Sequence, residues 1–581
     1  MIDNHRLQPP GNTGLLGWLR HYRLAWLSGD LTAGLVVSVM IIPQSMAYAM
    51  LAGLPVQIGL YASLLPLLAY ALLGSSMSLS VGPVAVTGLM TATLLAPLAV
   101  MGSGEYLQMA IWLALLSGVM LLAVGLLRLG FLANFLSHPV ISGFISGAAI
   151  LIAVSQLPHL FGLSALPSGP EQLLESWQPA NSLVLGMGLI SLTWLIYARS
   201  LLTGHLQALG VPAVAATLLA RLAPIVLVIT ALLVTVGGDL AESGVPVVGF
   251  LPAGLPSFFW ATPDWSDLRS LLLPAALISL VTFVESVSIA QSLARRKRQS
   301  IDGNRELLAL GAANLGSGLT GGFAVAGGFS RSIVNIEAGS NTPLAGVIAM
   351  LIIGLILLTI APLFAHLPLV ILAVVILVAV TPLIDVASLR RAWRYDRAEG
   401  LTLFSTAAGV LLLGIEGGIA LGICLSIAAQ LWRGSRPHIA VVGRVPGTQE
   451  FRNTKRHLVE TEPHLLALRI DENIFFANTK AIEHALYQAL RDYPDTREVL
   501  LILSAVNHID STGLDMLSEL TEGLVEKDIH LHLAEVKGPV MDNLEETDWI
   551  NQQVGEVFPS THIAFNTLGS QKRPASNDLE A

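Results

Sequence analysis

One apolar segment follows another between residues 31 and 432, and Gly, Pro and short polar loops separate them. A transmembrane helix needs about 20 consecutive, mostly apolar residues. The pattern therefore predicts fourteen spans, some of them broken. They are residues 31–51, 56–74, 78–100, 106–127, 134–156, 182–198, 221–236, 270–293, 304–320, 330–339, 342–362, 366–385, 399–414 and 416–432.

Lys and Arg residues collect on alternate loops between these spans, as the positive-inside rule requires of cytoplasmic loops. With the N-terminus inside, one side holds the basic residues at 20, 23, 128, 199, 221, 295–298, 305, 390–397, 433 and 436. The opposite loops, 101–105, 157–181, 237–269 and 415–416, contain only Arg269. This asymmetry predicts an even number of spans with both termini in the cytoplasm.

Beyond residue 437 the pattern changes to short strands that alternate with amphipathic helices. The predicted strands are 465–470, 498–503 and 529–534, and the predicted helices are 479–492, 514–527 and 540–554. Such alternation indicates an α/β domain with a mixed or parallel sheet covered by helices. The domain plan is a cytoplasmic N-terminal segment 1–27, a transmembrane domain 28–436, the α/β domain 445–568 and a disordered tail 569–581.

Composition supports two domains in two different solvents. Only 12% of residues are charged, about half the share that is usual in soluble chains, and the mean hydropathy is +0.68. Residues 1–436 hold 19 basic and 17 acidic residues, whereas residues 437–581 hold 12 and 23. These values exclude one large water-soluble domain and indicate that residues 1–436 lie largely in a lipid bilayer.

The sequence offers little for catalysis or for cofactors. The single cysteine, Cys424, excludes an intrachain disulfide and a cysteine metal site. HExxH, GxSxG and GxxxxGK[ST] motifs are absent from the sequence, so neither an enzyme nor direct use of ATP is expected. A sequence pI near 5.9 argues against a nucleic-acid partner.

Two short segments interrupt the membrane pattern with small residues and then restart a helix. They are 80–85 (SVGPVA) and 327–332 (GGFSRS). Backbone freed at membrane depth must face protein or a wet cavity, and the N-terminus of a half-helix attracts anions. The candidate anion-binding residues at these breaks are Val84, Ala85, Ser330, Arg331 and Ser332.

The chain also contains an internal echo. The segment 44–49 (QSMAYA) resembles 285–290 (ESVSIA), 241 positions later, and Val84 and Ser330 are 246 positions apart. Two inverted repeats of seven spans would produce this pattern. Chance matches between short segments rich in small residues remain the alternative.

Charged residues are expensive inside a membrane, so Glu285, Arg331 and Glu337 are candidates for function. A guanidinium at the tenth span adds a fixed charge and parallel donors, which suit an oxyanion. Glu285 is predicted to exchange a proton during transport, and a static ion pair with Arg331 is the alternative. Glu337 is interpreted as a helix-packing or loop-facing residue.

Gln44 and Tyr48 are four residues apart on the first span and therefore share one face of that helix. Both side chains can donate hydrogen bonds to an oxyanion. Polar contacts between helices are the alternative role.

Four segments together resemble the sulfate permease (SulP) family of anion transporters. They are 42–55 (IPQSMAYAMLAGLP), 80–86 (SVGPVAV), 327–346 (GGFSRSIVNIEAGSNTPLAG) and 508–517 (HIDSTGLDML). The last segment resembles the STAS domain, whose fold is shared with anti-sigma-factor antagonists. The resemblance extends over essentially the whole chain.

The resemblance implies a fold of seven plus seven inverted spans in a homodimer. Spans 1–4 and 8–11 would form a core domain, and spans 5–7 and 12–14 a gate domain. By similarity to plant sulfate transporters, five residues would surround sulfate, with the Glu as proton carrier: Gln44, Tyr48, Glu285, Ser330 and Arg331. Bicarbonate carriers of the family have an Asp on the eighth span and no Arg on the tenth, so this sequence differs from them twice.

The predicted function is secondary active, proton-coupled sulfate uptake by alternating access across the cell (inner) membrane. Dicarboxylate or bicarbonate transport, anion exchange, a channel and a non-transporting sensor are the alternatives. Ser511 or Thr512 in the STAS domain is either a phosphorylation site or the N-cap of the following helix. A regulator that binds this domain is an expected partner.

Overall fold

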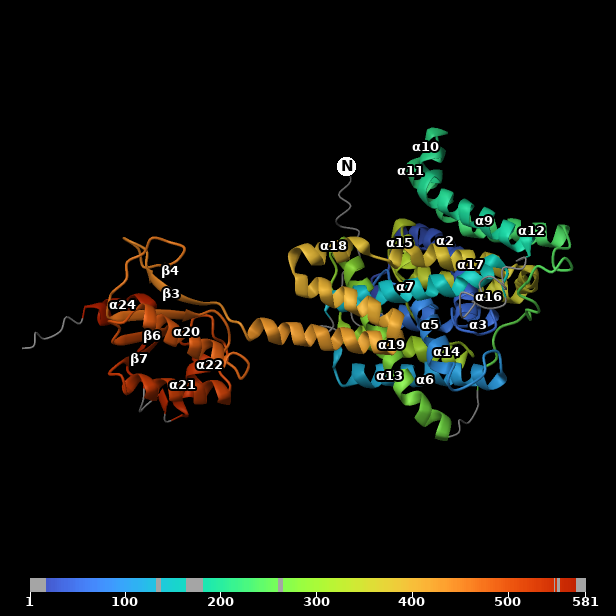
Figure 1. Cartoon of the computed structure of the whole chain (residues 1–581). Helices are drawn as coiled ribbons and strands as arrows, with labels where there is room; N and C mark the ends of the chain where they lie inside the picture. Colours follow the sequence, from blue (N-terminus) through green and yellow to red (C-terminus); the bar gives the residue numbers. More distant parts are fainter. Residues whose placement is uncertain are drawn as a thin grey trace, which may run out of the picture. The chain divides into compact units, whose positions relative to one another are not determined.

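The computed structural model describes residues 17–131, 137–163, 181–259, 265–547, 549–550 and 554–570. The chain forms two compact units, residues 1–426 and 427–581 (Figure 1). Most of the predicted N-terminal segment 1–27 and of the predicted tail 569–581 lies outside the described residues.

Every predicted span overlaps a helix of the first unit. These helices are α2 (Leu27–Leu51), α3 (Gln57–Tyr61), α4 (Leu65–Leu73), α5 (Ala85–Leu95), α6 (Gly104–Leu126), α7 (His138–Phe161), α9 (Ser182–Tyr197), α11 (Ala213–Arg221), α12 (Ala223–Gly237), α13 (Trp265–Lys297), α14 (Gly303–Leu319), α15 (Phe329–Glu337), α16 (Leu344–Thr359), α17 (Leu369–Val380) and α19 (Arg397–Gly434). The last two predicted spans both lie in α19, which is interrupted at Gly414, where φ is 80°.

Many of these helices are too short to cross a membrane unaided. Among the described residues, seven helices are long and apolar enough to span, or eight if α11 and α12, bent by 46°, count as one. Shorter apolar helices occur at 57–73, 85–95 and 344–359. The predicted third span, 78–100, is helical only from Ala85, because extended backbone precedes it.

The helices of the first unit pack in two groups. Helix α14 packs against α4 and α6, α13 against α6, and α2 against α15 and α16. In the other group, α17 packs against α7, α9 and α12. Contacts also join the two groups, since α17 and α12 pack against α2, and α7 packs against α5. The division into core and gate domains and their movement against each other stay predictions.

A buried carboxylate ties the start of α2 to the start of α16. Asp30 is fully buried and accepts hydrogen bonds from the backbone N–H groups of Asn341, at 2.7 Å, and Thr342, at 3.0 Å. The Thr342 hydroxyl donates a third bond at 2.7 Å. The first span is thereby fixed to a turn about 310 residues away in the chain.

A second buried carboxylate holds the loop that leads to the first helix break. Glu306, at the start of α14, is fully buried. It accepts hydrogen bonds from the Tyr70 hydroxyl (2.8 Å), from the Ser75 N–H and hydroxyl (2.9 and 2.6 Å), and from the Ser76 N–H (3.3 Å). All four donors come from α4 and the loop after it, so Glu306 fixes the approach to residue 80.

The second unit contains a sheet with six described strands in the order β4-β3-β5-β6-β7-β8. Its strands are β3 (Ile439–Arg444), β4 (Phe451–Asn453), β5 (Leu465–Ile470), β6 (Glu498–Ile502), β7 (His530–Ala534) and β8 (Val557–Phe558). Strands β5 to β8 are parallel to one another, and β3 is antiparallel to β5. The three predicted strands are confirmed, whereas the sequence analysis missed β3, β4 and β8.

Side chains along each strand alternate between the two faces of this sheet. Apolar side chains therefore point to both faces, and helices cover both. Leu466 and Leu468 of β5 belong to the core under α20 (Thr479–Asp492) and α21 (Ser511–Val525). Leu465 and Ala467 belong to the core under α24 (Thr561–Gly569).

Substituting Glu306→Ala should destabilise the membrane unit by about 3 kcal/mol, because buried donors would lose their acceptor. Thermal unfolding of the detergent-purified chain measures this. Glu306→Gln keeps an acceptor and should lose less, and the exposed Glu105→Gln is the matched control. Equal unfolding temperatures for Glu306→Ala and the control would show that the network contributes nothing.

Candidate functional site

The two interrupted segments meet in the structure. Strand β1 (Val81–Gly82) pairs antiparallel with β2 (Ala326–Gly327), and Val81 lies opposite Gly327. The Gly328 N–H also donates to the Ser80 carbonyl at 2.9 Å. Backbone freed by each break is therefore satisfied by the other break, as a membrane interior requires.

Helices α5 and α15 both begin next to this small ladder. Val84 is the N-cap of α5 and Ala85 its first residue, and both are buried. Gly328 is the N-cap of α15. The first N–H groups of a helix have no partner inside that helix and carry its positive dipole end.

Arg331 lies buried in the first turn of α15, with 2% of its surface exposed. Its Nη1 donates to the carbonyl of Pro83 at 2.9 Å, so the side chain crosses from one break to the other. Its Nε and Nη2 have no hydrogen-bond partner in the described part of the chain. A buried donor without an acceptor costs about 1 to 3 kcal/mol, and a bound oxyanion would remove that penalty.

Two glycines make room for the guanidinium. A Cβ on Gly328 would lie 2.7 Å from Nε and 2.8 Å from Nη2 of Arg331. A Cβ on Gly82 would lie 3.3 Å from Nη1. A side chain at either position would therefore crowd the guanidinium where it now lies.

Polar side chains around the ladder hold its backbone. The Ser332 hydroxyl accepts from the Ser80 N–H at 2.9 Å and donates to the Gly328 carbonyl at 2.7 Å. Ser286 accepts from the Gly327 N–H at 2.9 Å, and Asn335 donates to the Ser78 carbonyl at 3.0 Å. The hydroxyl of Ser332, a candidate anion ligand, is thus engaged with backbone.

Three ionisable candidates converge although they come from three helices. Tyr48 of α2, Glu285 of α13 and Arg331 of α15 lie close enough for their charges to interact. Glu285 and Arg331 form no ion pair, and the buried Oε2 of Glu285 has no hydrogen-bond partner in the described residues. The described residues therefore show no static bridge between them, and the proton-exchanging role of Glu285 stays a prediction.

The remaining candidates face a cavity. Gln44 is buried on α2, Ser330 is exposed at the start of α15, and both line a cavity of about 400 Å³. Glu285 lies instead on a small apolar pocket of about 30 Å³ with Phe144 and Val284. Glu337 forms an ion pair with Arg221 of α11.

In the second unit, Asp510 is the N-cap of α21. It accepts from the N–H of Gly513 at 2.7 Å and from the N–H of Phe476 at 2.9 Å. Ser511 and Thr512 occupy the first helical positions and are exposed. The prediction that one of them is the N-cap is wrong, because the preceding Asp has that role; their phosphorylation stays a prediction.

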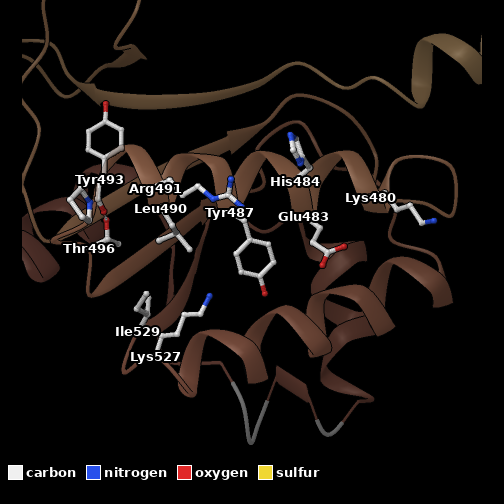
Figure 2. A pocket seen from close by; sticks show the side chains of 11 residues that line it. Lys480, Glu483, His484, Tyr487, Leu490, Arg491, Tyr493, Thr496, Lys527 and Ile529 are labelled. Atoms are coloured by element: carbon white, nitrogen blue, oxygen red, sulfur yellow. Dashed lines mark hydrogen bonds between the residues drawn. The ribbon is translucent and has the colours of Figure 1, made fainter.

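A larger pocket of about 790 Å³ lies along α20 in the same unit (Figure 2). Tyr487 and Glu483 point from α20 towards α21, and Lys527 follows α21 with its Nζ 4.8 Å from the Tyr487 ring centre. Sequence reasoning missed this pocket, since its basic residues, Lys480, Arg491 and Lys527, are spread over two elements without a motif.

Paired, interrupted helices within an apolar bundle, followed by an α/β unit, define a polytopic membrane protein of the transporter type. The chain belongs to the sulfate permease family, whose model matches residues 27–406, and a STAS domain matches residues 457–564. Its seven-plus-seven repeat plan is the plan of that family.

Relatives and a solved structure agree with this assignment. The chain is 36% identical over 539 residues to "Sulfate transporter 4.1, chloroplastic" of Arabidopsis thaliana, covering 89% of this chain and 76% of the relative. It is 31% identical over 584 residues to "High affinity sulfate transporter 2" of Stylosanthes hamata, covering 96% and 86%. The fold is similar to murine solute carrier 26 family member A9, an anion transporter solved in the inward-facing state, with a TM-score of 0.84, 21% identity and coverage of 97% and 94%.

Substituting Gly328→Ala should weaken anion binding by about 10-fold, because the new methyl group would displace the free donors of Arg331. Equilibrium binding of labelled sulfate to the purified chain measures this. Gly346→Ala is the control, since a Cβ there would meet only Leu67, at 3.7 Å or more. Unchanged affinity in Gly328→Ala would show that the guanidinium does not face the anion.

Proposed function

We propose that the protein takes up sulfate by secondary active transport coupled to protons, with the anion bound between the starts of α5 and α15. The observation that carries this proposal is Arg331, a buried guanidinium with two unused donors beside two half-helix N-termini. Similarity to the sulfate transporters of Arabidopsis thaliana and Stylosanthes hamata supports sulfate as the substrate.

Sulfate presents four oxygens in a tetrahedron, and it needs several donors to replace its water. Nε and Nη2 of Arg331 supply two donors in a fixed plane. The first N–H groups of α5, after Val84, and of α15 supply backbone donors. Gln44, Tyr48 and Ser330 add side-chain donors at the edge of the site.

Glu285 would couple the anion to a proton through charge balance. Sulfate carries two negative charges, and Arg331 offers one positive charge. An ionised Glu285 would repel the anion, whereas a protonated Glu285 would leave Arg331 free to bind it. After release of sulfate, Glu285 would lose its proton and Arg331 would regain a nearby negative charge. Proton and anion would then bind and leave together.

Alternating access would be produced by movement of the core group, spans 1–4 and 8–11, against the gate group in a homodimer. Both termini and the STAS domain would lie on the cytoplasmic side of the cell (inner) membrane, as the distribution of basic residues predicts. A regulator would bind the STAS domain, with phosphorylation at Ser511 or Thr512 as a means of control.

Substituting Arg331→Ala should weaken sulfate binding by about 10- to 100-fold, since charge-assisted hydrogen bonds would be lost. Arg331→Lys keeps a charge but not the planar donors, so its sulfate affinity should lie between those of the wild type and Arg331→Ala. Competition by selenate, fumarate and bicarbonate in the wild type identifies the class of anion. Wild-type affinity in Arg331→Ala would remove this residue from the site, and stronger competition by fumarate or bicarbonate than by unlabelled sulfate would favour those substrates.

Substituting Glu285→Gln should abolish the stimulation of sulfate uptake by an inward proton gradient, because the amide cannot exchange a proton. Uptake of labelled sulfate into liposomes, with and without a pH gradient, measures the effect. The amount of reconstituted protein and its equilibrium sulfate binding are the controls. Gradient dependence equal to the wild type would contradict the proposed proton carrier, and wild-type protein that accumulates no sulfate would contradict the proposed transport.

A further inference from the structure

The cavity of about 400 Å³ that reaches the site has two arginines on its walls. Met40 and Gln44 of α2 line one side, Ser330 and Val334 of α15 another, and α17 a third. Arg199 and Arg221 are the ionisable residues among the described residues that line it. These two guanidinium groups give the cavity wall positive charges that can attract an anion.

Arg221 is held by a carboxylate from the helix that carries the site. It forms an ion pair with Glu337, and 24% of its side chain and 38% of that of Glu337 are exposed. Ser330, Val334 and Glu337 are spaced four and three residues apart, so they share one face of α15. Glu337 thus lies at the far end of the helix face whose beginning lines the site.

In the ion pair with Arg221, the carboxylate of Glu337 occupies the place that a bound anion could take. A carboxylate and a sulfate present similar oxygens to the same guanidinium donors. A partly exposed ion pair is weak, so an anion that enters the cavity can replace the carboxylate. Arg199 donates to the Val378 carbonyl at 3.0 Å, which fixes its charge against α17.

We propose that Arg221 is a second, transient anion-binding residue of this transporter, and that Glu337 occupies it when no anion is present. Sulfate would bind Arg221 in the cavity first and then pass along α15, past Val334, to Ser330 and Arg331. This proposal rests on the proposed sulfate transport. It assigns a substrate-recruiting role to a charge pair that would otherwise only tie α11 to α15.

An anion-binding role and a purely structural role for this ion pair predict different changes in sulfate affinity when one residue is substituted. If Glu337 competes with sulfate, Glu337→Gln should lower the dissociation constant for sulfate by about 3-fold, whereas Arg221→Gln should raise it by about 3- to 10-fold. Arg221→Lys keeps the charge and should stay close to the wild type. The charge-swapped double variant, Arg221→Glu with Glu337→Arg, should not restore binding.

Equilibrium binding of labelled sulfate to the detergent-purified full chain measures these constants, and both faces of the protein are accessible in detergent. Sulfate exchange in liposomes should show the same changes in half-saturating concentration with little change in maximal rate. Arg394→Gln, an exposed arginine outside the cavity, is the matched control, and unfolding temperatures identify variants that fail to fold.

Shifts in the same direction for both single variants, with recovery in the charge-swapped chain, would overturn the proposal and leave a structural tie. Unchanged affinity in all variants would also overturn it. Sulfate binding by the wild type in either case would leave the proposed function standing, whereas no sulfate binding by the wild type would refute both.

Discussion

The structure depends on one constraint, which is that backbone polar groups inside a bilayer must find partners within the protein. Residues 74–84 and 320–328 are not helical, although they lie between helices of an apolar bundle. They satisfy each other through the β1–β2 ladder and through hydroxyl and amide groups of Ser332, Ser286 and Asn335. The two breaks, one in each half of the chain, thus meet at one place.

The same arrangement explains why the site contains unsatisfied polar groups. Arg331 uses one donor to reach the opposite break at Pro83, and two donors remain free in a buried position. Glu285 likewise keeps a buried oxygen without a hydrogen bond. A folded protein retains such a cost where a ligand repays it.

The sequence was sufficient to locate the breaks and the apolar segments, because Gly, Pro and hydropathy act over a few residues. It also brought Gln44, Tyr48, Glu285 and Arg331 forward as a set. It could not reveal Asp30 or Glu306, whose partners are more than 200 residues away and whose positions at span ends look like ordinary loop charges. Asp510 was missed as an N-cap for a smaller reason, since three consecutive residues there can all cap a helix.

Asp30 has a consequence for the way such a transporter can move. Its hydrogen bonds from Asn341 and Thr342 join the beginning of α2 to the turn between α15 and α16, and α2 and α15 also pack against each other. Helices α2 and α15, which carry Tyr48 and Arg331, are thus held together at one end. A carrier built in this way would be expected to move its anion within a binding site of constant shape. The surfaces that slide would then lie outside that site.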